Sequence, residues 1–113
     1  MAALTITAVT PVTATTAFAT IYTVPAGTTC IVKEMICCNT DTSARQLGIN
    51  FIPSGGSAGV TNTVRAYSSS TTIAAGDTET WNMDTALTTG DFIQIKADAN
   101  SVVSFRVSVG QVT

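Results

Sequence analysis

The sequence contains no histidine and few charged or aromatic residues. Charged residues make up 11% and aromatic residues 6% of its 113 residues, whereas an ordinary domain carries about 25% charged residues. Without histidine, the commonest base in nucleophilic catalysis is missing. No stretch approaches the ~20 consecutive apolar residues that a membrane helix needs. We therefore expect a protein that is not an enzyme and has no membrane partner.

The basic residues are few and stand apart in the sequence. They are Lys33, Arg45, Arg65, Lys96 and Arg106, and the formal net charge is −2. Binding to nucleic acid requires clustered Lys and Arg, which displace the counterions condensed on phosphates. The sequence therefore indicates no nucleic-acid partner.

The three cysteines, Cys30, Cys37 and Cys38, form an odd number. Cys37 and Cys38 are neighbours on an expected strand, so their side chains should point to opposite faces, which disfavours a bond between them. With no histidine and no C-x-x-C motif, zinc binding within one chain is not expected. Buried reduced thiols are the favoured interpretation, with a disulfide or a reactive thiol as the alternative. Folding in a reducing cytosol is consistent with this interpretation.

Few residue patterns suggest catalysis or ligand binding. A nucleophile–base pair of Cys37 or Cys38 with Lys33 or Asp41 is conceivable, but burial of the cysteines on a strand explains them better. Residues 54–57 read Ser-Gly-Gly-Ser. They lack the following lysine and helix of a phosphate-binding loop, so we expect a flexible loop there.

The acidic residues Asp77, Glu79 and Asp91 stand at expected turns and strand starts. Gly76-Asp77 and Gly90-Asp91 are typical of turns in which glycine takes a positive φ and aspartate accepts bonds from backbone N–H groups. These acids are too isolated for a calcium site and do not form an obvious glycosidase pair. We expect no catalytic, cofactor-binding or metal-binding residues.

The aromatic residues Trp81, Tyr22, Tyr67 and Phe92 are compatible with a sugar-stacking platform. In a chain with so few aromatics, they are more often anchors of the core or of an interface.

The composition favours β-strands throughout. Thr accounts for 22 of the 113 residues, and β-branched residues fit pleated strands. Turn residues divide the chain into strand-length segments, the pattern of a sandwich or barrel. At most one helical turn is expected, within Met83 to Leu87. The expected strands are Leu4 to Thr10, Phe18 to Val24, Cys30 to Cys38, Arg45 to Ile52, Thr63 to Tyr67, Asp77 to Met83, Phe92 to Ala97 and Ser101 to Val112. Apolar and polar residues alternate in Arg45 to Ile52, which predicts a half-buried strand with one wet face. Phe92 to Ala97 and Ser101 to Val112 alternate most clearly, with a hairpin turn between them.

The first 16 residues differ from the rest of the chain. This segment is rich in Thr and Ala, carries no charged side chain and is interrupted by Pro11. We expect residues 1–16 to form an N-terminal arm or edge strand and residues 17–113 to form one β-sandwich domain. The arm either pairs with its own domain or, the favoured alternative, pairs with the edge of a neighbouring subunit.

Two segments carry a recognisable pattern. In Tyr22 to Thr40, a strand ends in V-P-A-G, the next begins I-V-K and closes in N-T. Ile73 to Thr78 ends in G-D-T, and Leu87 to Ile93 reads L-T-T-G-D-F-I. Together these segments extend over residues 22–107 or so, and the pattern resembles small structural proteins in the virions of tailed bacteriophages.

The resemblance implies an all-β fold, a single antiparallel β-sandwich that is jelly-roll-like or immunoglobulin-like. The implied function is a capsid decoration or cement protein that stabilises the phage head by contacting several subunits of the major capsid protein. It implies a homo-oligomer, with a trimer favoured, located in the virion after synthesis in the host bacterial cytoplasm. No catalytic residue carries over.

Two alternatives to a decoration protein stay open. One is a tail, adaptor or baseplate component that contacts neighbouring tail subunits. The other is a host-glycan-binding β-sandwich module, which would need Trp81 or Tyr67 to be exposed.

Overall fold

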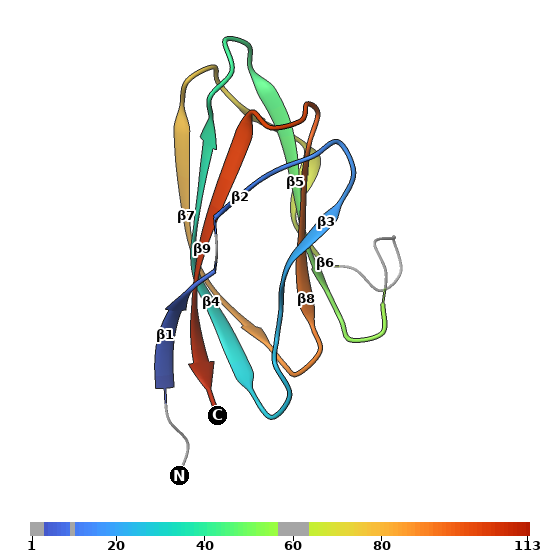
Figure 1. Ribbon diagram of the computed structural model, residues 1–113, viewed down its shortest axis with the longest axis vertical. Coiled ribbons are helices and arrows are strands. Elements are labelled where there is room, and N and C mark those ends of the chain that lie inside the picture. The colour runs from blue at the N-terminus through green and yellow to red at the C-terminus, as the bar shows by residue number, and fades with distance from the viewer. Residues whose placement is uncertain (1–3, 10, 57–63) are drawn as a thin grey trace.

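The protein consists of β-strands and turns wherever the structure describes it. The computed structural model describes residues 4–9, 11–56 and 64–113, without the side chains of residues 64–71 and 83. No helix occurs within these residues. In chain order (Figure 1) the strands are β1 (Leu4–Ala8), β2 (Val12–Thr13), β3 (Ala19–Thr23), β4 (Thr29–Asn39), β5 (Arg45–Ile52), β6 (Val64–Ile73), β7 (Thr78–Leu87), β8 (Phe92–Ala97) and β9 (Val103–Val112).

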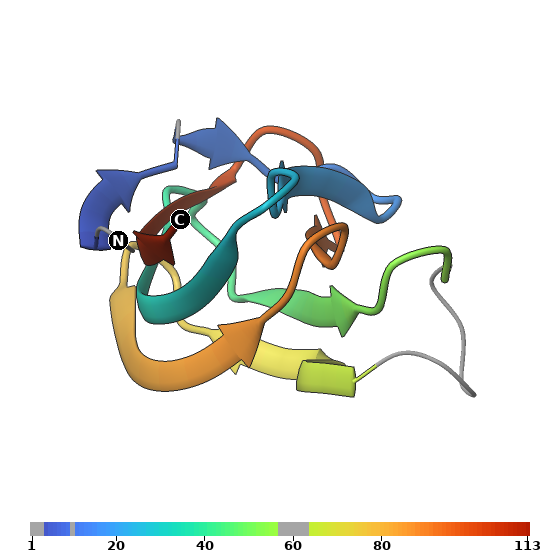
Figure 2. The same ribbon diagram turned by 90° about the horizontal axis from the view of Figure 1, so that it is seen from below.

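The strands form two antiparallel sheets that face each other, as the view from below shows (Figure 2). Sheet A has the order β1-β9-β4-β7, with β2 also paired to β9, and sheet B has the order β3-β8-β5-β6. The chain passes from one sheet to the other at every connection except β1–β2 and β5–β6. If β1 and β2 are taken as one interrupted strand, this is the eight-stranded order of a jelly roll. The expected β-sandwich is confirmed, in its jelly-roll form.

The core lies between the sheets and is filled by alternate residues of the central strands. On β4 a bulge between Val32 and Glu34 shifts the alternation, so that both Val32 and Met35 face the core. On β8 and β9 the alternation follows the sequence prediction. The largest fully buried side chains include Phe105, Met35, Leu47, Ile49, Ile52, Ile73, Ile93 and Ile95.

Two local predictions are wrong. The alternation of Arg45 to Ile52 predicts one wet face, but Gly48 and Asn50 are buried as well, and β5 lies in the interior of sheet B between β8 and β6. The segment Met83 to Leu87 is part of β7 rather than a helical turn, because pairing of β7 with β4 continues to Leu87.

The N-terminal arm forms one edge of sheet A. β1 and β2 both pair with β9 of the same chain, and β1 lies beside the last residues of β9 (Figures 1 and 2). The arm is anchored after β2 by Ala14, which is buried and donates its N–H to the carbonyl of Val103. The single chain therefore shows the edge strand of its own sheet, and pairing with a neighbouring subunit stays a prediction.

Candidate functional site: a candidate subunit interface on sheet A

One row of small and apolar residues crosses the outer face of sheet A. Ile6 of β1 lies opposite Gly110 of β9, Gly110 lies opposite Ile31 of β4, and Ile31 lies opposite Ala86 of β7. Directly paired residues of neighbouring strands point to the same face of a sheet. Because Cys30 next to Ile31 points into the core, this row faces away from the core.

Leu4 and Val112 extend this row by a second pair on the same face. Leu4 and Ile6 are each 65% exposed. They lie over Gly110, where an added Cβ would stand 3.4 Å from Leu4 Cδ1 and 3.5 Å from Ile6 Cδ1. Solvent-facing aliphatic residues grouped in this way mark interaction surfaces. We name as the outer apolar patch the residues Leu4, Ile6, Ile31, Ala86 and Val112.

Charged residues begin beside the patch on the same sheet. Lys33 Nζ lies 2.6 Å from Asp84 Oδ1, with the two side chains 50% and 78% exposed. An exposed pair of this kind contributes only about 0–1 kcal/mol. Further along the sheet, Arg106 is exposed. The outer face of sheet A is therefore divided along its strands into the outer apolar patch, which crosses the sheet from β1 to β7, and a part that carries the charged residues.

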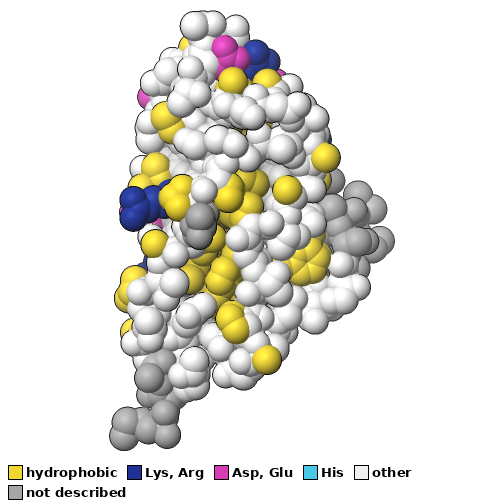
Figure 3. All heavy atoms as spheres, viewed as in Figure 1, with side chains coloured by type: hydrophobic (Ala, Val, Ile, Leu, Met, Phe, Trp, Pro, Cys, Tyr) yellow, Lys and Arg dark blue, Asp and Glu magenta, His cyan; other side chains and the backbone are white. Residues whose placement is uncertain are grey.

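A second group of apolar side chains lies on the side of the molecule bordered by β2 and β3. Figure 3 shows hydrophobic atoms along the middle of this side, with few charged atoms. Val12, Ile21 and Tyr22 are only partly buried against the core. The Tyr22 hydroxyl accepts a hydrogen bond from Gln111 Nε2 at 2.6 Å, which joins the two sheets. Beside β2, residues 11–13 line an open hollow of about 510 Å³.

The end of the sandwich opposite β1 is held by a buried amide. Asn39 is fully buried, and its Nδ2 donates to the carbonyls of Ser43 (2.9 Å), Ile73 (3.1 Å) and Ala74 (3.3 Å). Its Oδ1 accepts the N–H of Asp41 at 3.0 Å. One side chain thus joins the β4–β5 connection to the end of β6. We call this region the polar end.

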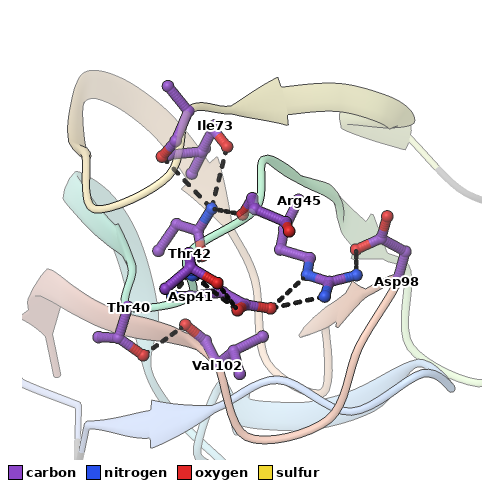
Figure 4. A network of polar contacts seen from close by, with 10 residues as sticks. Thr40, Asp41, Thr42, Arg45, Ile73, Asp98 and Val102 are labelled. Carbon is purple, nitrogen blue, oxygen red and sulfur yellow. Dashed lines mark hydrogen bonds and ion pairs between the residues drawn. The ribbon is translucent and has the colours of Figure 1, made fainter.

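Arg45 completes the polar end (Figure 4). Its guanidinium lies 2.6 Å from Asp41 Oδ2 and 3.9 Å from Asp98 Oδ1. The hydrogen bond from Arg45, followed by one from the Thr42 N–H, lowers the pKa of the Asp41 carboxyl. Because its carboxylate is occupied by Arg45 and by the N–H and hydroxyl of Thr42, Asp41 serves to hold the loops together.

Two of the three cysteines are buried, as the sequence predicts, and the third is half-buried. Cys30 and Cys37 are buried, Cys38 is half-buried, and all three are free thiols. Burial raises the pKa of Cys37 to about 12, with further contributions from Cys38 and Glu79. Burial also raises the pKa of Cys30. A thiol with a raised pKa holds little of the reactive thiolate.

The conceivable nucleophile–base pair does not form. Lys33 binds Asp84, and Asp41 binds Arg45. Within the described ranges, no group of three or more His, Cys, Asp or Glu could hold a metal ion. Over the same ranges, no helix is long and apolar enough to cross a membrane.

Asp77 and Asp91 cap backbone groups, as expected. Asp77 Oδ1 accepts the N–H of Thr78 at 3.0 Å. Asp91 accepts the N–H groups of Ser54 and Thr88, each at 2.9 Å. Partial burial alone would raise the pKa of Asp91, but these hydrogen bonds and one from the Thr88 hydroxyl outweigh it and lower the pKa.

The glycine before each of these aspartates has the predicted positive φ, 70° at Gly76 and 85° at Gly90. At Gly90 a Cβ would also collide with Ser54. The N–H of Ser54 is bound to Asp91 and is therefore not free to hold a phosphate. Of residues 54–57, where we expect a flexible loop, residue 57 lies outside the described residues.

The described aromatic residues share no common platform. Trp81 of β7 and Tyr22 of β3 pack partly against the core from opposite sheets. Phe92 alternates with the buried Ile93 and so faces the outside of sheet B. The side chain of Tyr67 lies outside the described part. Trp81 is half-buried, and the sugar-binding alternative, which needs Trp81 or Tyr67 to be exposed, stays a prediction.

The remaining basic residues are spread over the molecule. Lys96 Nζ lies 5.3 Å from the centroid of the Phe18 ring. The side chain of Arg65 is not among those described, and Arg106 lies on sheet A.

Sequence reasoning missed the residues of the outer apolar patch. The lack of charged residues in the arm was the available signal of a contact surface. Apolar residues and threonines alternate in Leu4–Ala8, but this alternation does not tell which face of the strand is exposed.

The fold and this surface define a small jelly-roll protein with an apolar patch on the outer face of one sheet. No family model and no curated protein matches the sequence. Among solved structures, it is similar to a chain of the T13 viral particle of infectious bursal disease virus, with a TM-score of 0.61, 10% identity, and coverage of 98% of this chain and 31% of that chain. A chain of the VP2 subviral particle of the same virus gives a TM-score of 0.61, 10% identity, and coverage of 98% and 32%.

A third similar structure is a chain of Bacillus endospore appendages, which form disulfide-linked pili. Its TM-score is 0.56 at 17% identity, with coverage of 99% of this chain and 88% of that chain. This chain thus spans about a third of the viral chains and most of the appendage chain. At these identities the comparisons show the jelly-roll fold.

Proposed function

We propose that this chain is a structural subunit of a virus particle, acting as a decoration or cement protein on the head of a tailed bacteriophage. The observation that carries the proposal is the solvent-facing outer apolar patch on a sandwich with few charges, a surface suited to burial against other subunits. The similarity of the fold to chains of a viral particle supports a particle component. The patterns in residues 22–107 support the tailed-phage assignment.

A cement protein stabilises a shell by burying surface against several subunits at once. The proposed partner is the major capsid protein, and the proposed form is a homo-oligomer, with a trimer favoured. Buried thiols fit synthesis in the reducing cytoplasm of a host bacterium. The proposal assigns the chain no catalytic role.

The test uses virions that lack the protein, to which the purified chain is added back. Heating with a DNA-binding dye reports the temperature at which the genome is released, and we expect the added chain to raise it. Ile31→Glu, in the middle of the outer apolar patch, should lose this protection. Thr80→Glu, an exposed position of β7, should keep it.

Equal robustness of depleted and complete particles would show that the cementing role is wrong. Protein quantification in the same particles separates the two virion locations. A high copy number supports the capsid, and a low one supports the alternative of a tail, adaptor or baseplate component.

A second candidate function is the subunit of a protein fibre. One observation favours it: the match to the endospore appendage chain extends over most of both chains, whereas the viral matches leave two thirds of those chains unmatched. Negative-stain electron microscopy of the purified chain distinguishes the candidates, because a fibre subunit should form filaments without capsid protein.

A further inference from the structure

Among the described strands at the edges of the two sheets, β1 is the least protected against pairing with another strand. Natural β-proteins prevent unwanted pairing at edge strands with charges, prolines and bulges. β7 carries Glu79 and Asp84 and has a register shift against β4. β3 has a register shift against β8, and β6 contains Arg65 and has two register shifts against β5. β1 pairs with β9 in unbroken register and contains neither a charged residue nor a proline.

The backbone of β1 leaves hydrogen-bonding groups at its free edge. Along a strand in a sheet, the N–H and C=O groups of successive residues point alternately to the two sides. The N–H of Val9 donates to the Val107 carbonyl at 2.8 Å, so the odd-numbered residues of this segment face β9. The groups of Leu4, Ile6 and Ala8 therefore point to the free edge.

We propose that β1 of a second copy of this chain pairs with this edge. The two strands run antiparallel about a two-fold axis, in the register that overlaps all of Leu4–Ala8 and places Ile6 opposite Ile6 of the partner subunit. In this register Leu4 lies opposite Ala8 of the partner subunit, and Thr5 opposite Thr7 of the partner subunit. The pairing joins the sheets of the two copies into one.

The side chains of β1 complement those of a second β1. Apolar residues meet apolar residues on the outer face and threonines meet threonines on the other, and such cross-strand pairs stabilise sheets. The first charged side chain of the sequence is Lys33, so the two arms do not repel each other. Joining the strands also brings the two outer apolar patches together and covers part of Leu4 and Ile6.

This contact does not depend on the proposed virion function. A two-fold contact uses the same surface on both partners and closes at two copies. A trimer would have to form through another surface, and β1 pairs would then join one trimer to another.

Charge substitutions at Ile6 test the contact, because this residue faces itself across the axis. Ile6→Lys and Ile6→Glu should each weaken self-association by at least about tenfold, since like charges stand directly opposite. An equimolar mixture of the two variants should associate again. Sedimentation velocity measures the mass, and native mass spectrometry with one variant labelled with nitrogen-15 identifies mixed pairs.

Thr80→Lys is the matched control. It adds the same charge to an exposed position at the opposite edge of sheet A and should leave association unchanged. Wild-type chain that stays monomeric at its highest soluble concentration would overturn the proposal. Unchanged association of the Ile6 variants would also overturn it. Loss of association without recovery in the mixture would show that another strand, and not a second β1, takes this edge.

A covalent test checks the register. In a Cys38→Ser background, which leaves only the buried Cys30 and Cys37, Ile6→Cys should form disulfide-linked dimers on mild oxidation. Opposite residues of an antiparallel pair lie about 4.5–5.5 Å apart at Cα, within disulfide range. Leu4→Cys alone should not form such dimers, because its partner is Ala8. Dimers formed equally by both variants would show that the register is wrong.

Discussion

The polar end and the β1 edge are held in opposite ways. At the polar end, the buried Asn39 and the paired Asp41 and Arg45 bind loops from three parts of the chain. At the β1 edge, β1 is held to β9 by backbone hydrogen bonds, and none of the β1 side chains is fully buried. Buried polar groups bind loops through contacts that solvent cannot replace. A strand held mainly by its ladder stays available to a partner.

Because of this difference, the polar end should affect the stability of the fold, and the β1 edge should affect association with other subunits. Removing a group at the polar end leaves other groups of the same chain without partners, which costs folding free energy. Removing β1 exposes β9, a strand that keeps its pairing with β4 along its whole length. Substitutions at the two regions should therefore affect different measurements.

The largest effect on stability is expected for Asn39→Ala. The change leaves the carbonyls of Ser43, Ile73 and Ala74 without their donor, and it should lower the free energy of unfolding by about 2–4 kcal/mol. Urea unfolding followed by tryptophan fluorescence measures it. Asn100→Ala is the control, because this exposed residue accepts one bond, from the Thr16 N–H. Equal losses in the two variants would contradict the assigned role of Asn39.

A smaller effect is expected when residues 1–8 are deleted. None of the described side chains in this segment, those of Leu4–Ala8, is fully buried. The hydrogen bonds that disappear are offset by the chain entropy regained, so the free energy of unfolding should fall by about 1 kcal/mol. The same urea titration, run on monomer at low concentration, gives this value. A loss as large as that of Asn39→Ala would mean that β1 is integral to the fold.

The smallest effect is expected on the loss of stability at acidic pH. The pKa of Asp41 is lowered in the folded chain, so its contribution to stability is present above the unfolded value of about 3.9 and is lost as the pH falls through the folded value. Asp41→Asn should therefore reduce the drop in the urea midpoint between about pH 5 and pH 3.

Arg45→Gln, which keeps the carboxylate and removes its main partner, should reduce the same drop. If the acid dependence of both variants matched that of the wild type, the ion pair would have no part in it.

Much of the fold follows from local patterns. The turns at Gly76-Asp77 and Gly90-Asp91 and the alternation in β8 and β9 are local properties, and the structure has them as predicted. The burial of Asn50 was not predictable, because it depends on the neighbours of β5 in sheet B. Asn39 was likewise not singled out, because its partners at Ile73 and Ala74 are distant in sequence.

The sequence by itself determined that the chain is built of strands, has few charges and has an uncharged arm. Strand content and turns depend on residues close together in the chain, and their preferences act wherever the segment lies. The tertiary structure alone decided the jelly-roll order and the direction of the arm. An alternating strand has two equivalent faces, and only the register of β1 on β9 sets Leu4 and Ile6 toward solvent.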